Sequence, residues 1–159
     1  MNQPTSKTKL ARILLGIVGV LIVAAAVYFV AMNRMMARMN SEVPSDLDVS
    51  STRVSDNDLF RVSYVSSQDI VPVNQMHQWT LHVETADGQQ VEDATITVDG
   101  DMPQHGHGLP TKPRVTKYLG NGDYLVEGMK FQMGGWWVMD FTISTDGQTD
   151  AVHFNMMLK

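Results

Sequence analysis

The chain has 159 residues, of which 43% are hydrophobic and 18% are charged, and its formal net charge is −5. It contains no cysteine, which excludes a disulfide scaffold, a zinc–thiolate site and a cysteine nucleophile. Residues 1–39 carry five basic side chains and no acid, whereas residues 40–159 carry seven basic side chains and all seventeen acids, so the two parts have charges of +5 and −10. A segment this acidic lacks the clustered Lys and Arg that phosphate groups require, so nucleic acid is not an expected partner.

Residues 13–32 form an apolar, uncharged run near the start of the chain. Twenty residues of helix are about 30 Å long, which matches the hydrocarbon core of a bilayer. The run exceeds the 7–15 apolar residues of a typical cleavable signal peptide, so we predict an uncleaved signal anchor, with cleavage as the alternative. The short basic tail, residues 1–12, is expected to stay in the cytoplasm. These features predict a single-pass protein of the bacterial inner membrane, with its C-terminal domain in the periplasm.

Residues 33–58 are predicted to be a juxtamembrane segment followed by a polar tether. Methionines recur at helical spacing, at Met32, Met35, Met36 and Met39. This pattern indicates either an apolar helix face or a methionine relay for Cu(I). Residues 40–58 are rich in Ser and Asp and lack aromatic side chains, which is typical of a solvated linker.

From residue 59 the hydrophobic period changes to two, which indicates β-strands. Asp87-Gly88, Asn121-Gly122 and Asp146-Gly147 supply tight-turn chemistry between them. Residues 59–159 are therefore predicted to form a mainly β, seven-stranded, antiparallel immunoglobulin-like sandwich. The expected strands are 59–65, 76–85, 91–99, 112–118, 123–131, 136–144 and 149–158.

The alternation also predicts which side chains face the core. Trp79 and Leu81 share one face of their strand, as do Met139 and Phe141 of another. The tyrosine and valine at 124 and 126 continue the pattern up to Gly128, where a bulge is expected to shift the register. The imidazoles at 82 and 153 fall on outward faces and are expected to be solvated.

The order of the strands predicts where a site would lie. If successive strands run antiparallel, the three tight turns fall at one end of the sandwich. The longer connections, residues 66–75, 100–111 and 132–135, then share the other end. Because functional residues concentrate on such loops, this loop-rich end is the expected site. The first predicted strand follows the tether directly, so this end is expected to face away from the membrane.

The loop-rich end carries side chains suited to a soft metal ion. His105 and His107 alternate with glycine in one loop, and Met102 lies just before them. His77 and Met133 are expected at the same end. Imidazole with thioether is a ligand set that suits copper, whereas calcium or magnesium would require a cluster of carboxylates. We predict a copper site formed by His105, His107 and Met102, with His77 and Met133 as further candidates.

Other readings of the same residues stay open. The imidazoles can belong to a rigid structural loop, and the methionines can be core filler. An alternative function is a non-metal structural or protein-interaction module of the cell envelope, with Trp136 as an anchor residue. Binding of a small ligand in the mouth of the sandwich is a third option. No nucleophile elbow, carboxylate pair or phosphate loop is recognisable, so the protein is not expected to be an enzyme.

Two motifs resemble one known family. The run Met-Pro-Gln-His-Gly-His-Gly at residues 102–108 and the later Phe-Gln-Met-Gly-Gly-Trp at residues 131–136 resemble the YtkA-like family of small bacterial immunoglobulin-like domains. The resemblance covers about residues 75–158. Because the family is similar in size and setting to periplasmic copper-handling sandwiches, the resemblance implies copper binding at Met102, His105 and His107. The implied role is copper binding or delivery near a membrane metalloprotein or oxidase client. The chain departs from copper chaperones in having no His-x-Met pair.

Overall fold

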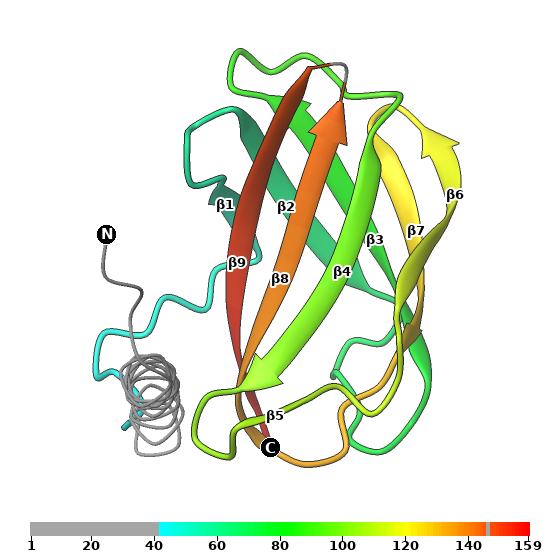
Figure 1. Ribbon diagram of the computed structural model, residues 1–159. Helices are drawn as coiled ribbons and strands as arrows, with labels where there is room; N and C mark the ends of the chain where they lie inside the picture. Colours follow the sequence, from blue (N-terminus) through cyan, green and yellow to red (C-terminus); the bar gives the residue numbers. More distant parts are fainter. Residues whose placement is uncertain (1–41, 146) are drawn as a thin grey trace, which may run out of the picture. The chain divides into compact units, whose positions relative to one another are not determined.

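The computed structural model describes residues 42–145 and 147–159, and within this part of the chain no helix is present. The described residues contain nine strands (Figure 1). They are β1 (Thr52–Val54), β2 (Phe60–Ser66), β3 (His77–Thr85), β4 (Thr95–Met102), β5 (His107–Gly108), β6 (Arg114–Gly120), β7 (Asp123–Met129), β8 (Gly135–Thr145) and β9 (Gln148–Leu158).

The strands form two sheets that pack face to face around one core (Figure 1). The five-stranded sheet has the order β1-β2-β3-β7-β6, and the four-stranded sheet has the order β5-β4-β8-β9. Every pairing between these strands is antiparallel. The prediction of a mainly β, antiparallel sandwich from residue 59 onward is therefore confirmed.

The core consists of the side chains that the period of two selects. Trp79, Leu81, Met139 and Phe141 are each 0% exposed. Rings from the two sheets meet across the interface: the centroids of Trp79 and Phe141 lie 6.3 Å apart, and Tyr64 meets Phe154 edge-on at 5.0 Å. Aromatic pairs of this kind add to the stabilisation from buried area.

All seven predicted strands exist, and two short strands were not predicted. β5 falls inside the expected loop at 100–111, and β1 falls inside the expected tether, where Arg53 pairs with Val62 of β2. A three-residue strand carries too little alternation for the sequence to reveal it. The Asp87-Gly88 turn closes a short hairpin in which Glu84 pairs with Gln90, but it does not pair β3 with β4, because these two strands belong to different sheets.

The chain crosses between the sheets at residues 91–94, where Tyr124 fixes its path. The Tyr124 hydroxyl donates to the Val91 carbonyl oxygen at 2.7 Å and accepts from the Ala94 N–H at 3.1 Å. Val91 is 7% exposed, so the crossover segment is itself part of the core.

The chain enters the sandwich at the loop-rich end, contrary to the prediction. β1 precedes β2 and runs antiparallel to it, which reverses the direction of entry. The Asn155 side chain, near the end of β9, donates to the Asp48 carbonyl oxygen at 3.1 Å. The prediction that the loop-rich end faces away from the membrane assumed entry at the tight-turn end, and this premise is wrong.

The predicted anchor, residues 13–32, and the methionine stripe at 32–39 lie outside the described residues. Among the residues that are described, no helix is long and apolar enough to cross a membrane.

Candidate metal site

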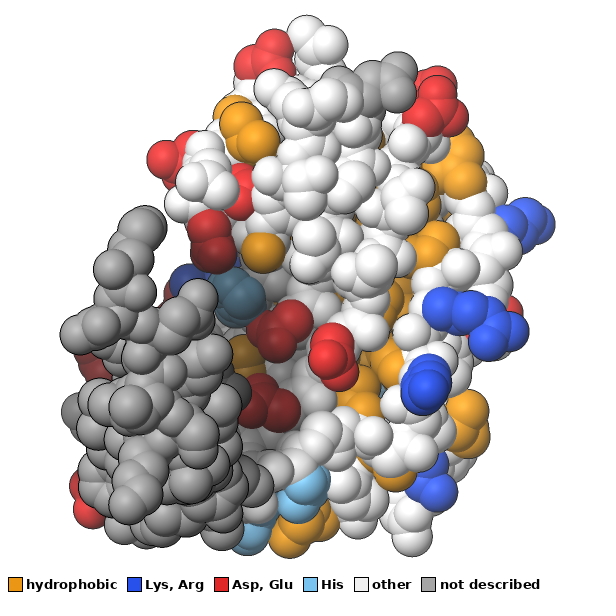
Figure 2. Space-filling model, in the orientation of Figure 1, with side chains coloured by type: hydrophobic (Ala, Val, Ile, Leu, Met, Phe, Trp, Pro, Cys, Tyr) orange, Lys and Arg blue, Asp and Glu red, His pale blue; other side chains and the backbone are white. Residues whose placement is uncertain are grey.

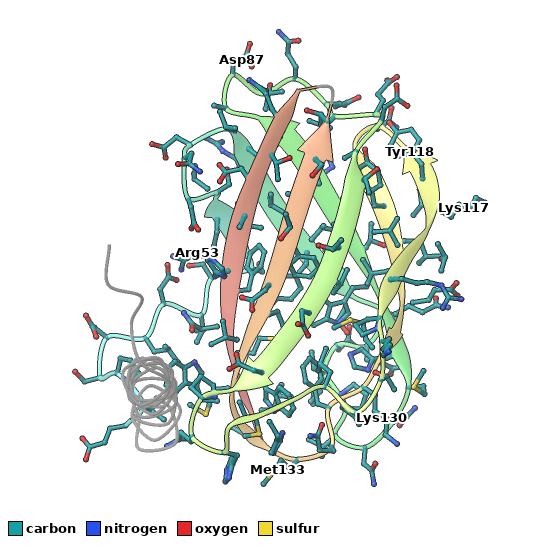
Figure 3. The ribbon with its side chains drawn as sticks, viewed as in Figure 1. Arg53, Asp87, Lys117, Tyr118, Lys130 and Met133 are labelled. Atoms are coloured by element: carbon teal, nitrogen blue, oxygen red, sulfur yellow. The ribbon has the colours of Figure 1, made fainter. Side chains whose placement is uncertain are left out.

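Three connections meet at one end of the sandwich, as the strand order predicts. The Asn74 N–H donates to the Phe131 carbonyl oxygen at 2.6 Å, which ties the β2–β3 connection to the β7–β8 connection. The Thr111 hydroxyl donates to the Gly128 carbonyl oxygen at 2.7 Å, which adds the segment before β6. Figure 3 shows Met133 at this end and Asp87 at the opposite end. The loop-rich end is thus a single, connected surface.

The loop that carries the two imidazoles is a tight turn. The N–H groups of His105 and Gly106 both donate to the Met102 carbonyl oxygen, at 3.0 and 2.9 Å. Gly106 has a φ of 65°, which glycine adopts without steric cost. The chain then returns as β5, in which His107 pairs with Met102. Directly opposite residues on neighbouring strands project to the same face with their Cβ atoms about 5 Å apart.

The turn places His105, His107 and Met102 together. The imidazole centroids of His105 and His107 lie 5.7 Å apart with an interplanar angle of 21°. Met102 is 0% exposed, while His107 is half-buried and His105 is exposed. We call these three residues the His–Met rim. Figure 2 shows His side chains beside hydrophobic ones at this end of the molecule.

Trp137 and Gln132 hold the His107 ring in place. The ring meets Trp137 edge-on, with centroids 5.8 Å apart. The Gln132 side-chain nitrogen donates to the Gly108 carbonyl oxygen at 3.1 Å and lies 2.9 Å from His107 Nδ1. Nδ1 also lies 3.3 Å from the Gly108 carbonyl oxygen, so Gln132 and Gly108 both contact this side of the ring. Gln132 was not predicted from the sequence, since a lone Gln in a loop carries no signal.

His77 lies apart from the His–Met rim. It begins β3 and is 5% exposed. Its ring centroid is 5.7 Å from that of Phe131, and Phe131 in turn meets Trp137 at 5.2 Å. Two aromatic rings thus separate His77 from His107. The structure brings His77 to the loop-rich end, as predicted, but not to the imidazole pair.

Met133 lies at the surface of the same end. Its side chain is 36% exposed, and its backbone carbonyl oxygen accepts from the Trp137 indole N–H at 3.1 Å. Its role in the structure is to position Trp137 through the backbone.

The donor set of the rim consists of two imidazoles and one thioether. No group of three or more His, Asp or Glu side chains in residues 42–145 and 147–159 is placed to hold a metal ion. Calcium, magnesium and structural zinc sites require such groups. Two imidazoles with a buried thioether suit copper instead.

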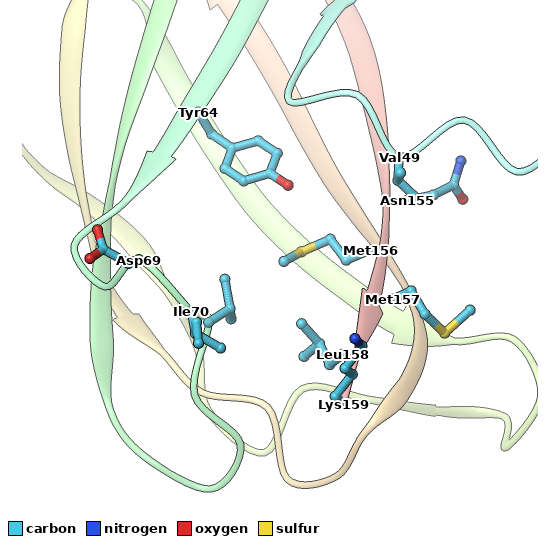
Figure 4. A pocket seen from close by; sticks show the side chains of 10 residues that line it. Val49, Tyr64, Asp69, Ile70, Asn155, Met156, Met157, Leu158 and Lys159 are labelled. Carbon is cyan, nitrogen blue, oxygen red and sulfur yellow. The ribbon is translucent and has the colours of Figure 1, made fainter.

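An apolar pocket lies at the same end of the sandwich, on the open edge between the two sheets (Figure 4). Its volume is about 440 Å³. Tyr64, Ile70, Met156 and Leu158 point into this space, whereas Asn155 points away (Figure 4). Ile70 is 85% exposed. This pocket corresponds to the mouth of the sandwich in which a small ligand was considered.

Comparison with known proteins connects the β domain with one family. The sequence model of a family described as YtkA-like matches residues 52–142. The match begins at β1, earlier than the resemblance at residues 75–158, and includes the whole His–Met rim. No curated protein matches the sequence. Among solved structures, the ZirS C-terminal domain is similar over 72% of this chain and 81% of that chain, with 14% identity and a TM-score of 0.38.

Proposed function

The chain belongs to the YtkA-like family, and we propose that its β domain binds copper at the His–Met rim through His105 and His107, with Met102 in support. The observation that carries the proposal is the tight turn that stacks the two imidazoles at 5.7 Å and pairs His107 with Met102. If the loop were purely structural, there would be no reason for an exposed imidazole, that of His105, to lie beside a buried thioether.

The ring separation fits a shared ion. Histidine nitrogens bind such metals at about 2.0 Å, so two rings on one ion have their centroids roughly 5–6 Å apart. The imidazoles of the rim already have this spacing without any movement of the backbone. The donor set also suits both oxidation states, because imidazole favours Cu(II) and thioether with imidazole favours Cu(I).

The surrounding residues prepare His107 for this role. Gln132 and Trp137 fix the orientation of its ring, as outer-shell partners of metal-binding histidines commonly do. Binding through Nε2 requires the ring proton to lie on Nδ1, from which the carbonyl oxygen of Gly108, 3.3 Å away, accepts a hydrogen bond. Gln132 is a positioning residue, because its side-chain nitrogen contacts both this carbonyl oxygen and the His107 ring.

The proposed setting is the periplasmic face of a bacterial inner membrane, with residues 13–32 as an uncleaved anchor. The tether then restricts the rim to clients near the bilayer and raises their effective concentration. The rim shares its end of the sandwich with the point of chain entry, around Asp48. A membrane metalloprotein such as an oxidase is the proposed client. No catalytic role is proposed.

The test is a copper titration of the full chain, purified in detergent, with Cu(II) and with Cu(I) under a competing chelator. His105→Ala combined with His107→Ala is expected to weaken binding at least about tenfold, a loss of about 1.4 kcal/mol. The matched control is His82→Gln combined with His153→Gln, which removes the same number of imidazoles from the outer faces. Equal affinity in both double variants would overturn the proposal and favour a non-metal interaction module.

A further inference from the structure

His77 has a buried nitrogen that the fold leaves without a partner. Nδ1 lies 3.2 Å from the Gln75 carbonyl oxygen, and a carbonyl oxygen only accepts, so Nδ1 carries the proton. The lone pair of Nε2 is therefore free, and this atom is buried without a hydrogen-bond partner. An unsatisfied buried acceptor costs about 1–3 kcal/mol. Burial also lowers the pKa of His77, against the hydrogen bond to Gln75, so the ring is neutral at pH 7.

A β-bulge places a thioether opposite this ring. His77 pairs with Met129 of β7, while Trp79 pairs with Val126, so β7 contains one extra residue between the two pairs. Gly128, with a φ of 85°, permits the bulge. Met129 is 0% exposed and occupies the cross-strand position next to His77. Bulges commonly re-aim side chains beside functional sites.

The surroundings of this pair are apolar on one side and open to a surface cleft on the other. Phe131 and Trp79 border the His77 ring, at centroid distances of 5.7 and 6.3 Å. On the other side His77 lines a surface cleft of about 480 Å³ together with Met76, Gln78 and Glu127. Met76 is 55% exposed at this cleft. Glu127 is engaged, because the Gln78 side chain donates to it at 2.8 Å.

We propose that His77 and Met129 form a second, buried site that takes a soft monovalent cation, Cu(I), and that this site is separate from the His–Met rim. One neutral imidazole and one thioether provide the soft, uncharged ligands that Cu(I) accepts. Zinc takes four ligands, at least three of them from the protein, and hard cations require oxygen. The exposed Met76 lines the same surface cleft as His77. The site does not depend on copper binding at the rim.

The test uses Ag(I) as a redox-stable monovalent probe on the full chain in detergent, with histidines labelled for NMR. The expected result is a shift of the His77 Nε2 resonance that saturates at one equivalent for that site, with no shift when Zn(II) is added. The resonances of His105 and His107 are read in the same spectra. Absence of Ag(I) binding at the His–Met rim and absence of Ag(I) binding at His77 are therefore distinguished. A His77 resonance that stays in place in excess Ag(I) would show that Ag(I) does not bind Nε2, which overturns the proposal.

Met129→Leu tests the second ligand, because it conserves volume and core packing. Even outer-shell changes alter metal affinity about 10–100-fold, so loss of the thioether is expected to weaken Ag(I) binding at His77 at least about tenfold. The matched control is Met156→Leu, which removes a buried thioether from β9 and is expected to leave the His77 titration unchanged. Equal Ag(I) affinity at His77 in the two variants would exclude Met129 as a ligand. Because site-specific shifts are read, binding by the methionines at 32–39 does not enter the comparison.

Discussion

The two ends of the sandwich treat buried polar atoms in opposite ways. At the tight-turn end, Asp150 is 3% exposed and accepts from the Asn57 N–H at 2.9 Å, from the Asn57 side chain at 2.8 Å and from the Leu59 N–H at 3.4 Å. At the loop-rich end, the described residues include three buried side-chain atoms without a partner, which are His77 Nε2, Trp79 Nε1 and Gln132 Oε1.

This difference in hydrogen bonding suggests that the tight-turn end serves stability and that the loop-rich end serves ligand binding. A buried charge that is fully hydrogen-bonded fixes the local structure, whereas an unpartnered buried atom costs stability. Asp150 fastens the β1–β2 corner to β9 and has no ligand-binding features. The loop-rich end keeps unsatisfied atoms near both candidate metal sites. Substitutions at the two ends should therefore differ in kind, with stability lost at one end and metal binding lost at the other.

The largest expected effect is at Asp150. Asp150→Ala leaves the N–H groups of Asn57 and Leu59 without their acceptor, so we expect the free energy of unfolding to fall by about 3 kcal/mol. Chemical denaturation at pH 7 measures it. Asp150→Asn keeps one acceptor oxygen and is expected to cost less, roughly 2 kcal/mol. Unchanged stability in Asp150→Ala would remove the distinction between the two ends.

The effect of Asp150 also has a predicted pH dependence. Burial alone would raise the pKa of Asp150, but hydrogen bonds from Ser55 and Asn57 hold it well below its usual range. A carboxylate with a lowered pKa stabilises the fold above the unfolded value of about 4. The difference in stability between the native chain and Asp150→Asn is therefore expected to be complete at pH 7 and to shrink below about pH 4.

Gly135 offers the corresponding test at the loop-rich end. Its φ is 119°, and an added Cβ would lie 2.7 Å from the terminal methyl carbon of Met102. Gly135→Ala is therefore expected to cost about 2 kcal/mol of stability and to displace the Met102 thioether. Gly88→Ala is the control, because Gly88 has a φ of 82° and no atom within 4 Å of an added Cβ. It adopts a strained backbone without a clash, so we expect about 1 kcal/mol.

Copper titration completes the Gly135 comparison. Gly135→Ala is expected to weaken copper binding at the His–Met rim, whereas Gly88→Ala is expected to leave it unchanged. If both variants bound copper like the native chain, Met102 would have no part in the site.

The sequence predicted the parts of the fold in which buried and exposed residues alternate regularly. Strands of seven to eleven residues carry enough alternation to reveal both their limits and their buried faces, as Trp79 and Phe141 show. The antiparallel order then placed the three long connections at one end, and Gly128 marked the bulge in β7. These inferences succeed because period and turn chemistry are local properties.

The sequence did not predict features that depend on contacts between distant residues. Asp150 accepts hydrogen bonds from residues more than ninety positions away, and nothing near it indicates this. β1 became visible only through its pairing with β2. The same holds for the site: only a loop was expected at residues 100–111, and the tight turn that joins His105, His107 and Met102 became visible through the pairing of β4 with β5. The separation of His77 depends on where Phe131 and Trp137 pack.

The outer faces show the same limit for electrostatics. His82 and His153 were expected to be simply solvated, yet each ring lies between two carboxylates. His82 meets Asp123 at 2.6 Å and Glu84 at 3.2 Å. Burial alone would lower the pKa of His82, but the hydrogen bonds to these two carboxylates outweigh it and raise the pKa. The pKa values of the outer-face histidines are therefore raised, whereas the pKa of the buried His77 is lowered.

The smallest expected effect tests this contrast at His153. Its Nδ1 lies 2.6 Å from Asp140 and its Nε2 lies 3.1 Å from Asp56. The hydrogen bond to Asp140 raises the pKa of His153, burial opposes it, and Asp56 adds to the increase. A raised pKa means that the stabilisation is complete below the unfolded value of about 6.5 and is lost as the pH rises through the folded value.

His153→Gln is therefore expected to lower the free energy of unfolding at pH 6 and to have almost no effect at pH 9. The side chains of His153, Asp140 and Asp56 are 48%, 40% and 56% exposed, so solvent screening limits the loss to less than about 1 kcal/mol. On an Asp140→Asn background the same substitution should cost less, because one of the two carboxylates is already absent. A loss of equal size at both pH values would show that His153 contributes packing rather than charge. In that case the contrast between a raised pKa at His153 and a lowered pKa at His77 would not be expressed in the stability of the protein.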